Sequence, residues 1–278
     1  MTKNERQDPR VSDWWQTGIV EMEPGMIRLR GYPIEELIGN VGFVPMIWLM
    51  LRGELPRPEQ AALLEAALTA AVDHGPQAPS IATARMAVSC GIGLNNAMAS
   101  AVNLLGDVHG GAGEQAVELY LRIAEACAAG QTPAEASRAC IDRMLDSGSR
   151  FIPGYGHRFH PVDPRAPRLL ELVDRAAAAG TVDGGFAAIG RAVEADLERR
   201  KGKRIPMNID GATAVIYAEL GFPAPLARGL FCLSRSVGIL AHAWEQSQEP
   251  ARNKGPMPKE YLWRYRGAAL RHLDQEGE

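Results

Sequence analysis

The stretch that decides the fold is residues 58–72, PEQAALLEAALTAAV. Leu63, Leu64, Ala67 and Ala71 recur in it at helical spacing, so one face of the segment is apolar. This pattern predicts an amphipathic helix. Segments of the same kind follow one another along the chain, whereas stretches in which valine or isoleucine alternates with polar residues are nearly absent.

Outward from this segment, the same periodicity predicts most of the remaining architecture. Helices are predicted at residues 43–52, 80–105, 114–127, 133–145, 166–178, 184–200, 212–220 and 225–244, with one opening at Pro33 and a last one from about Lys259. Thr132 is expected to cap the helix at 133–145. A short strand is predicted at 27–30, after the turn Pro24-Gly25. We therefore expect an all-α fold of roughly ten to twelve helices.

Length and composition are those of a globular protein with a substantial core. The 278 residues suffice for one large domain or two smaller ones, and 46% hydrophobic with 23% charged residues is ordinary for this class. The formal net charge of −3 gives no reason to expect a nucleic acid as partner. Because no run of about 18 apolar residues is present, no membrane association is expected either.

The cysteines and the first residues bear on location and on metals. Cys90, Cys127, Cys140 and Cys232 are widely spaced, without the pairing of metal ligands, and three of them lie in apolar or alanine-rich stretches that favour buried free thiols. The first residues are polar and lack the apolar run of a secretory signal. We expect a reducing, cytoplasmic location and no bound metal.

Three polar islands interrupt the helical pattern, and each presents one titratable side chain beside glycine. They are residues 106–111 (GDVHGG), 153–158 (PGYGHR) and 208–211 (NIDG). Their titratable groups are His109, His157 and Asp210. Two imidazoles and a carboxylate suffice to move protons on and off carbon and oxygen, and the glycines let a ligand approach the backbone.

Each of these residues, taken alone, also has a structural explanation. His109 could mark the end of a helix, and the loop around His157 could be a solvated turn. Asp210 could cap the helix that begins near Ala212, and taken alone this explanation outweighs catalysis. For His242, a position in the core or on the surface is favoured over a role in a site.

Charged residues nearby extend the candidate site. Asp163 and Pro164 suit a helix start, and Arg165 after them offers a fork for a carboxylate. Arg235 lies in the apolar run 229–243, where an unpaired charge is costly, so it must be paired or line a cavity. The sequence contains no P-loop, no Gly-x-Ser-x-Gly elbow and no His-Glu-x-x-His zinc motif.

Together and in this order, these segments resemble the citrate synthase superfamily. The three islands match the motifs of its two catalytic histidines and its catalytic aspartate, and the similarity runs with gaps from about Arg28 to Gln246. The segments 30–37 (RGYPIEEL), 51–56 (LRGELP) and 234–242 (SRSVGILAH) also match. The resemblance implies an all-α homodimer or higher homo-oligomer, with a large domain (1–147 and 207–278) and a small domain (148–206) around a cleft.

The resemblance also implies the role of each residue. Asp210 exchanges a proton with the methyl carbon of acetyl-CoA, His109 bonds the thioester oxygen, and His157 acts as acid or base at the oxaloacetate carbonyl. His74, Arg165 and Arg235 bind the di- or tricarboxylate, and Gly154, Gly156 and Arg158 bind coenzyme A. No cofactor is held; the coenzyme A thioester is a substrate.

Several departures favour one branch of the superfamily. Ala112-Gly113 replaces the family's Ala-Asn, the chain is shorter than a usual citrate synthase, and Met257 stands where a substrate arginine is expected, with Arg252 nearby. These features look closer to citryl-CoA lyase and to the lyase-like domain of ATP-citrate lyase. We expect cleavage of citryl-CoA, or a related 3-hydroxyacyl-CoA, to acetyl-CoA and oxaloacetate. The alternatives are a synthase that also hydrolyses the thioester, and a non-catalytic acyl-CoA-binding subunit.

Overall fold

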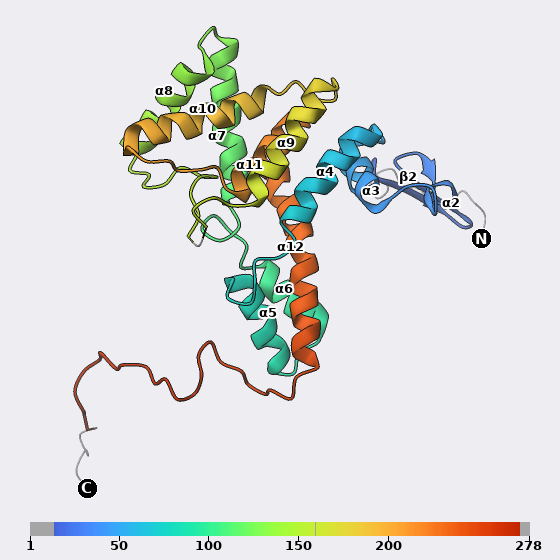
Figure 1. Cartoon of the computed structure of the whole chain (residues 1–278). Coiled ribbons are helices and arrows are strands. Elements are labelled where there is room, and N and C mark those ends of the chain that lie inside the picture. The colour runs from blue at the N-terminus through green and yellow to red at the C-terminus, as the bar shows by residue number, and fades with distance from the viewer. Residues whose placement is uncertain (1–13, 159, 273–278) are drawn as a thin grey trace. The chain divides into compact units, whose positions relative to one another are not determined.

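The computed structural model describes residues 14–158 and 160–272, and in this part of the chain the fold is helical (Figure 1). Its eleven helices confirm the expected all-α class. They are α2 (Ile34–Leu37), α3 (Phe43–Arg52), α4 (Pro58–Ala70), α5 (Pro79–Ser89), α6 (Leu94–Val102), α7 (Ala112–Ala128), α8 (Pro133–Asp146), α9 (Arg165–Ala178), α10 (Gly185–Lys201), α11 (Ile209–Glu219) and α12 (Ala224–Ser247).

A small antiparallel sheet precedes the helices. Its strands are β1 (Val20–Glu23), β2 (Met26–Leu29) and β3 (Tyr32–Pro33), paired in the order β1-β2-β3. The predicted strand at 27–30 is confirmed as β2, with Leu29 opposite Val20 on one side and Tyr32 on the other. Gly25 has a φ of 82°, which glycine adopts at little cost, so the β1–β2 turn falls where Pro24-Gly25 predicted it.

Two helix predictions are wrong. The segment 80–105 forms two helices, α5 and α6, because Gly91 takes a φ of 90° and the chain resumes a helix only after Gly93. No helix follows Lys259 among the described residues up to position 272, a segment that begins just after Pro258. The cap of α8 is confirmed, since the Glu135 amide donates to the Thr132 side chain.

The cysteines agree only in part with the prediction of buried thiols. All four are free of disulfides, and Cys140 on α8 is buried. Cys127 and Cys232 are half-buried, and Cys90 is exposed at the end of α5.

The chain groups into two compact units by its contacts. Unit 1 takes its described residues from Met1–Val72 and Gly106–Arg235, and unit 2 from Asp73–Leu105 and Ser236–Glu278. These boundaries differ from the expected large and small domains, because segment 148–206 belongs to unit 1, where α9 and α10 pack on α11. The division into a large domain (1–147 and 207–278) and a small domain (148–206) stays a prediction.

Helix α11 is the centre of unit 1. Every residue from Gly211 to Ala218 is buried, and the helix contacts α4, α7, α9 and α10. A helix that is apolar on all sides is stable only when other elements cover it. The N-terminal turn of α11, which carries Asp210, is therefore held by the surrounding helices.

In unit 2, α5 and α6 pack closely through small side chains. Ala84, Ala97 and Ala101 are fully buried there together with Ile81 and Ile239. Helix α12 is long and apolar enough, by length and composition alone, to cross a membrane, a test that core helices also pass. In unit 1 it packs as a core helix, where Ser234 is buried and donates to the Leu68 carbonyl.

The second and third polar islands meet through bare backbone. A Cβ added to Gly211 would lie 2.4 Å from the Gly154 carbonyl oxygen, and one added to Gly154 would lie 2.7 Å from the Gly211 Cα. The Asn208 amide donates to the Gly154 carbonyl at 2.9 Å, and the Gly156 amide donates to the Pro206 carbonyl at 2.8 Å. This contact needs glycine on both sides.

We predict that Gly211→Ala destabilises the fold whereas Gly113→Ala does not. The first substitution forces a methyl group into the Gly154 backbone, at a cost of about 1–3 kcal/mol. The second places a methyl group in open space within α7, where alanine favours a helix by about 1 kcal/mol over glycine. Thermal unfolding followed by circular dichroism should separate the two variants. Equal melting temperatures would contradict the close contact.

Candidate active site

Asp210 is the second residue of α11 and lies in its first turn. The cap is Asn208, whose side-chain oxygen accepts from the amides of Asp210 at 3.0 Å and Gly211 at 3.2 Å. The structural explanation of Asp210 as a helix cap is therefore wrong. The helix also begins three residues earlier than Ala212, so the whole third island belongs to its N-terminal end.

The surroundings of Asp210 favour its protonated form. Burial raises the pKa of this carboxyl above its ordinary 3.8, and it outweighs the opposing charges of Arg235 and Arg165. The Asp163 carboxylate adds to the rise. Asp210 therefore stands within the electrostatic reach of three charged side chains of unit 1.

Arg165 and Asp163 form a two-pronged ion pair at the start of α9. Arg165 donates through Nε and Nη2 to the two Asp163 oxygens, both at 2.9 Å, and its amide donates to Oδ1 at 3.1 Å. A helix start here was predicted with Asp163 as its cap and Pro164 in its first turn. The helix does start here, but the cap position is Pro164 and α9 begins at Arg165. The other Asp163 oxygen also accepts from the Ile209 amide at 3.0 Å, which ties this pair to α11.

The pKa of Asp163 reflects this bonding. Burial alone would raise it, since the side chain is 0% exposed. The bonds from Arg165 and from the Ile209 amide prevail and hold the pKa at about 2. Asp163 is thus a carboxylate at any ordinary pH and a fixed link between the second and third islands.

His157 lies on the loop that precedes this pair. Burial lowers its pKa below 6.5; His160 and Arg165 act in the same direction, while Asp163 opposes them. The His160 amide donates to His157 Nδ1 at 3.1 Å. In the neutral ring the proton is therefore on Nε2, which can donate a hydrogen bond to a ligand.

His109 lies on the loop between α6 and α7. Burial lowers its pKa, and the positive charge of Arg235 lowers it further. The loop closes on itself, since the Gly106 amide donates to the His109 carbonyl at 2.8 Å. A neutral imidazole at this place can donate a hydrogen bond without carrying a charge.

An ion-pair cluster that the sequence did not single out holds this loop on α12. Arg228 donates to Asp107 at 2.6 Å and also pairs with Glu114 in the first turn of α7. Arg228 and Arg235 are seven residues apart on α12, so both point to one side of the helix. That spacing was the signal in the sequence that could have revealed Arg228.

Arg235 is 5% exposed and carries its charge into unit 1. Its Nε donates to the Ala71 carbonyl at 3.1 Å, and its guanidinium lies 4.8 Å from the centre of the Phe231 ring. Arg165 Nη1 donates to the neighbouring Ala70 carbonyl at 3.4 Å. The expectation that Arg235 must be paired is confirmed, and both arginines are anchored where α4 ends.

The three predicted catalytic residues therefore share two arginines within one unit. Arg235 acts on His109 and Asp210, and Arg165 acts on His157 and Asp210. His74 belongs to unit 2.

The residues predicted to bind coenzyme A differ in their surroundings. Gly154 is buried in its contact with Gly211, and the Gly156 carbonyl accepts from the Asn208 side chain at 2.6 Å. Arg158 is exposed. Their contact with coenzyme A stays a prediction. The two glycines also have a structural role, because both take part in the contact between the second and third islands.

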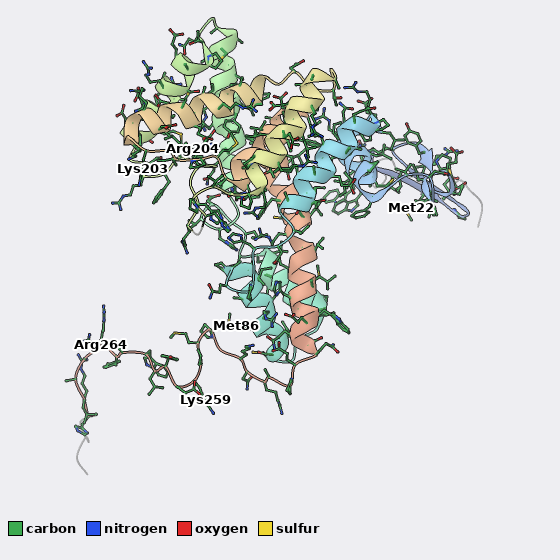
Figure 2. All side chains as sticks on the ribbon, viewed as in Figure 1. Met22, Met86, Lys203, Arg204, Lys259 and Arg264 are labelled. Atoms are coloured by element: carbon green, nitrogen blue, oxygen red, sulfur yellow. The ribbon has the colours of Figure 1, made fainter. Side chains whose placement is uncertain are left out.

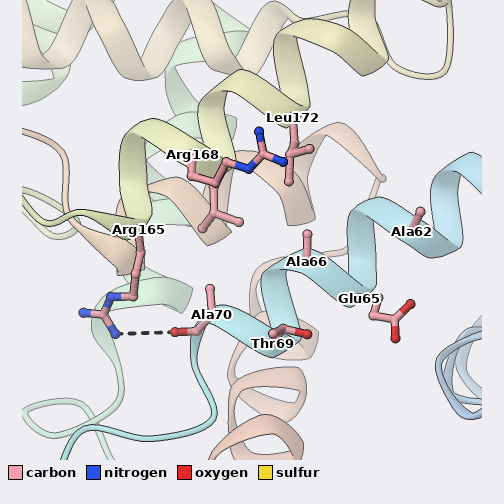
Figure 3. Close-up of a pocket in the computed structure, with 9 residues that line it drawn as sticks. Ala62, Glu65, Ala66, Thr69, Ala70, Arg165, Arg168 and Leu172 are labelled. Atoms are coloured by element: carbon pink, nitrogen blue, oxygen red, sulfur yellow. Dashed lines mark hydrogen bonds between the residues drawn. The ribbon is translucent and has the colours of Figure 1, made fainter.

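A groove of about 450 Å³ runs between α4 and α9 in unit 1 (Figure 3). Its walls are mostly apolar, and Arg165 is the predicted site residue that lines it. The lining residues are Ala62, Glu65, Ala66, Thr69, Ala70, Arg165, Arg168, Leu169 and Leu172. Within the described part of the chain, no three His, Cys, Asp or Glu side chains gather as a metal site would require.

Two tyrosine hydroxyls join the second island to the helices around it. Tyr155 donates to the Gly190 carbonyl at 2.8 Å, and its oxygen lies 2.8 Å from the Tyr120 hydroxyl. The Tyr120 hydroxyl also lies 3.4 Å from the Gly211 carbonyl. Burial raises the pKa of both tyrosines, so they remain protonated donors.

We predict that Asp163→Asn is severely destabilising and that Asp174→Asn is not. The first removes the charge of a buried carboxylate and leaves the half-buried Arg165 guanidinium without its partner, which costs about 3 kcal/mol. The second removes an exposed pair with Arg191, which contributes at most about 1 kcal/mol. Urea unfolding at neutral pH measures both, and similar losses in the two variants would contradict the assignment.

The ion pair also predicts a pH dependence of stability. Because the folded pKa of Asp163 is about 2 against an ordinary 3.8, ionised Asp163 stabilises the fold by about 2 kcal/mol above pH 4. This contribution is lost as the pH falls from about 4 towards 2. The difference in unfolding free energy between the wild type and Asp163→Asn should shrink by about 2 kcal/mol over that interval, and a constant difference would contradict the prediction.

Comparison with known proteins places this site in a family. The model of the family described as citrate synthase, C-terminal domain, matches residues 56–266. The chain is 31% identical over 202 residues to the citrate synthase of Haloferax volcanii and 32% identical over 200 residues to that of Synechocystis. These matches cover 72% and 71% of the chain. The chain belongs to the citrate synthase family.

The solved structures refine the comparison. The chain spans about half the length of the curated relatives it matches, 50% and 48% of the two named. A citryl-CoA lyase from Hydrogenobacter thermophilus matches with a TM-score of 0.82 and 33% identity, over 94% of this chain and 98% of that one. An ATP citrate lyase from Methanothrix soehngenii, solved with citrate and coenzyme A, matches with a TM-score of 0.76 at 21% identity, over 96% of this chain and 45% of that one. The second match shows the fold alone.

Proposed function

We propose that the chain is a citryl-CoA lyase-like enzyme, which cleaves citryl-CoA or a related 3-hydroxyacyl-CoA to acetyl-CoA and oxaloacetate. The observation that carries this proposal is the convergence of His109, His157 and Asp210 on Arg165 and Arg235. The similarity to a citryl-CoA lyase along nearly the full length of that chain supports the lyase direction.

In this reaction the bond between the hydroxyl-bearing carbon and the acetyl methylene carbon breaks. The ring proton of neutral His157 first moves through solvent from Nε2 to Nδ1, which breaks the bond from the His160 amide. Nε2 then takes the hydroxyl proton as the carbonyl of oxaloacetate forms, and the imidazolium later releases a proton to solvent. The electron pair of the broken bond moves to the thioester as an enolate, whose oxygen accepts a hydrogen bond from His109. Asp210 then donates its proton to the methylene carbon and completes acetyl-CoA.

The directions of the pKa shifts suit these roles. A raised pKa keeps more of Asp210 in the acid form that the final step needs. Lowered pKa values keep His157 neutral, ready to take a proton, and His109 neutral, ready to donate a hydrogen bond. Arg165 and Arg235 supply positive charge for the carboxylates of the citryl group.

The coenzyme A part of the substrate is proposed to lie along the second island. Tyr155 pairs antiparallel with Met207, so the strand-like segment after α10 runs beside residues 154–156. Lys203 and Arg204 lie on this segment, and both are exposed (Figure 2). With Arg158 they offer cationic side chains for phosphate groups.

The second candidate is a synthase that condenses an acyl-CoA with oxaloacetate or another oxoacid and then hydrolyses the thioester. The curated relatives named citrate synthase favour it. The same residues serve both directions of the carbon–carbon step, so release of free coenzyme A separates the two candidates. A third candidate, a non-catalytic acyl-CoA-binding subunit, requires binding without turnover.

We predict that the purified protein converts citryl-CoA to oxaloacetate and acetyl-CoA without releasing free coenzyme A. Oxaloacetate is measured by coupled reduction, and thiol release by a colorimetric reagent. Asp210→Asn should reduce turnover by at least about a hundredfold while coenzyme A binding persists, because it removes the proton donor. Free coenzyme A from acetyl-CoA and oxaloacetate would support the synthase instead. No turnover in either direction, with any of several oxoacids, would overturn both enzymatic readings.

We also propose a homodimer, supported by an apolar stripe on α12. Leu233, Val237, Leu240 and Trp244 are exposed and recur at helical spacing along one side of this helix. Unpartnered stripes of this kind are typical of helices that pack against another chain.

The dimer prediction has a direct test. Light scattering coupled to gel filtration should give twice the chain mass of 30.1 kDa, and Val237→Glu should shift the protein towards the monomer because it places a charge in the stripe. Glu198→Lys, a charge change at an exposed position of α10, serves as the control. A wild-type monomer at micromolar concentration would contradict the proposal.

A further inference from the structure

A row of polar contacts in unit 2 ends at the turn that carries His74. The row runs from Arg85 on α5 through His242 on α12 to Asp73, just before His74. The sequence favoured a core or surface position for His242. The structure instead places this side chain between a guanidinium and a carboxylate.

The partners of His242 determine where its ring carries the proton. Arg85 Nη1 lies 3.1 Å from Nδ1, and a guanidinium only donates, so Nδ1 must accept. In the neutral ring the proton is then on Nε2, which lies 3.2 Å from Asp73 Oδ1. His242 thus accepts on one side and donates on the other.

The Asp73 carboxylate, held by His242, in turn binds the backbone amides of the turn that contains His74. Its Oδ2 accepts from the Gly75 amide at 3.0 Å, and the His74 amide also bonds to this carboxylate. Burial alone would raise the pKa of Asp73, but the bonds from Gly75, His74 and His242 prevail and lower it. Gly75 has a φ of 80°, which completes a tight turn around His74.

We propose that His242 is a positioning residue that fixes, through Asp73, the conformation of the turn that carries His74. The inference deepens the proposed function and rests on it, because His74 is the proposed ligand of a substrate oxygen. The proposal assigns to His242 a proton on Nε2 and an acceptor on Nδ1, and it assigns no contact with substrate.

Replacing His242 should affect the turn at Asp73 and leave the contact between α5 and α12 in place. Arg85 also pairs with Glu245 and with Glu249, the latter at 3.1 Å, so the link between α5 and the end of α12 survives without the imidazole. The charged groups that face His242 are Asp73 from the loop, Arg85 from α5 and Glu245 on its own helix, 4.0 Å from Nδ1. Loss of His242 thus detaches Asp73 alone.

Two substitutions separate positioning from packing. Gln carries an acceptor oxygen and a donor amide, so His242→Gln can reproduce both contacts; His242→Leu fills the space and provides neither. We expect kcat/KM for citryl-CoA to fall about tenfold in the Leu variant, equivalent to about 1.4 kcal/mol, and to stay within about threefold of the wild type in the Gln variant. If the Leu variant does not fold, His242→Asn replaces it, since its amide is one methylene too short to reach both partners.

Amide hydrogen exchange of residues 73–75 supplies a readout that does not depend on activity. The His74 and Gly75 amides should exchange slowly in the wild type and in the Gln variant, and faster in the Leu variant. Equal exchange in all three proteins, or a Gln variant as impaired as the Leu variant, would overturn the inference. An inactive wild type with the expected exchange pattern would instead refute the proposed function and leave the positioning of the turn intact.

Discussion

The candidate site depends on two guanidinium groups held where one helix ends. Arg165 donates to the Ala70 carbonyl and Arg235 to the Ala71 carbonyl, at the C-terminus of α4. A helix C-terminus carries partial negative charge and unsatisfied carbonyls, so it compensates cations that burial would otherwise disfavour. With both charges fixed there, Arg235 acts on His109 and Asp210, and Arg165 acts on His157 and Asp210.

At Asp210 the positive charges and burial shift the pKa in opposite directions. At the two histidines they shift the pKa in the same direction. At Asp210 desolvation prevails over Arg235 and Arg165, and the pKa rises. At His109 and His157 desolvation and the arginines act in the same direction, and the pKa falls. Asp163 moderates this balance, because its carboxylate neutralises much of the charge of Arg165. All three groups are thereby brought towards their neutral forms, which suits the exchange of protons with an uncharged thioester.

Much of the fold was predictable because helical periodicity is a local property of the sequence. Residues 43–52 gave the bounds of α3, and the cap at Thr132 was found where Ser, Thr, Asp and Asn usually cap. The prediction of a single helix at 80–105 was wrong because the apolar pattern continues through Gly91, whose positive φ follows the end of α5. A glycine does not reveal in the sequence whether it lies in a helix or breaks one.

The sequence predicted which residues form the candidate site better than it predicted how they are arranged. The order of the three motifs indicated His109, His157 and Asp210, and their convergence on two arginines required the fold. Asn208 and Arg228 were missed in their roles, because a cap and an ion pair depend on neighbours that the sequence does not place. The glycine pair 154 and 211 was visible, but its backbone contact joins residues 57 positions apart.

The most direct test of the action of Arg235 is a nuclear magnetic resonance titration of Asp210 and His109 in the wild type and in Arg235→Met. Arg235 lowers the pKa of both groups, so its removal should raise both, with the chemical shifts of His157 as an internal reference. A variant that folds and leaves both pKa values unchanged would contradict the action of Arg235 on His109 and Asp210.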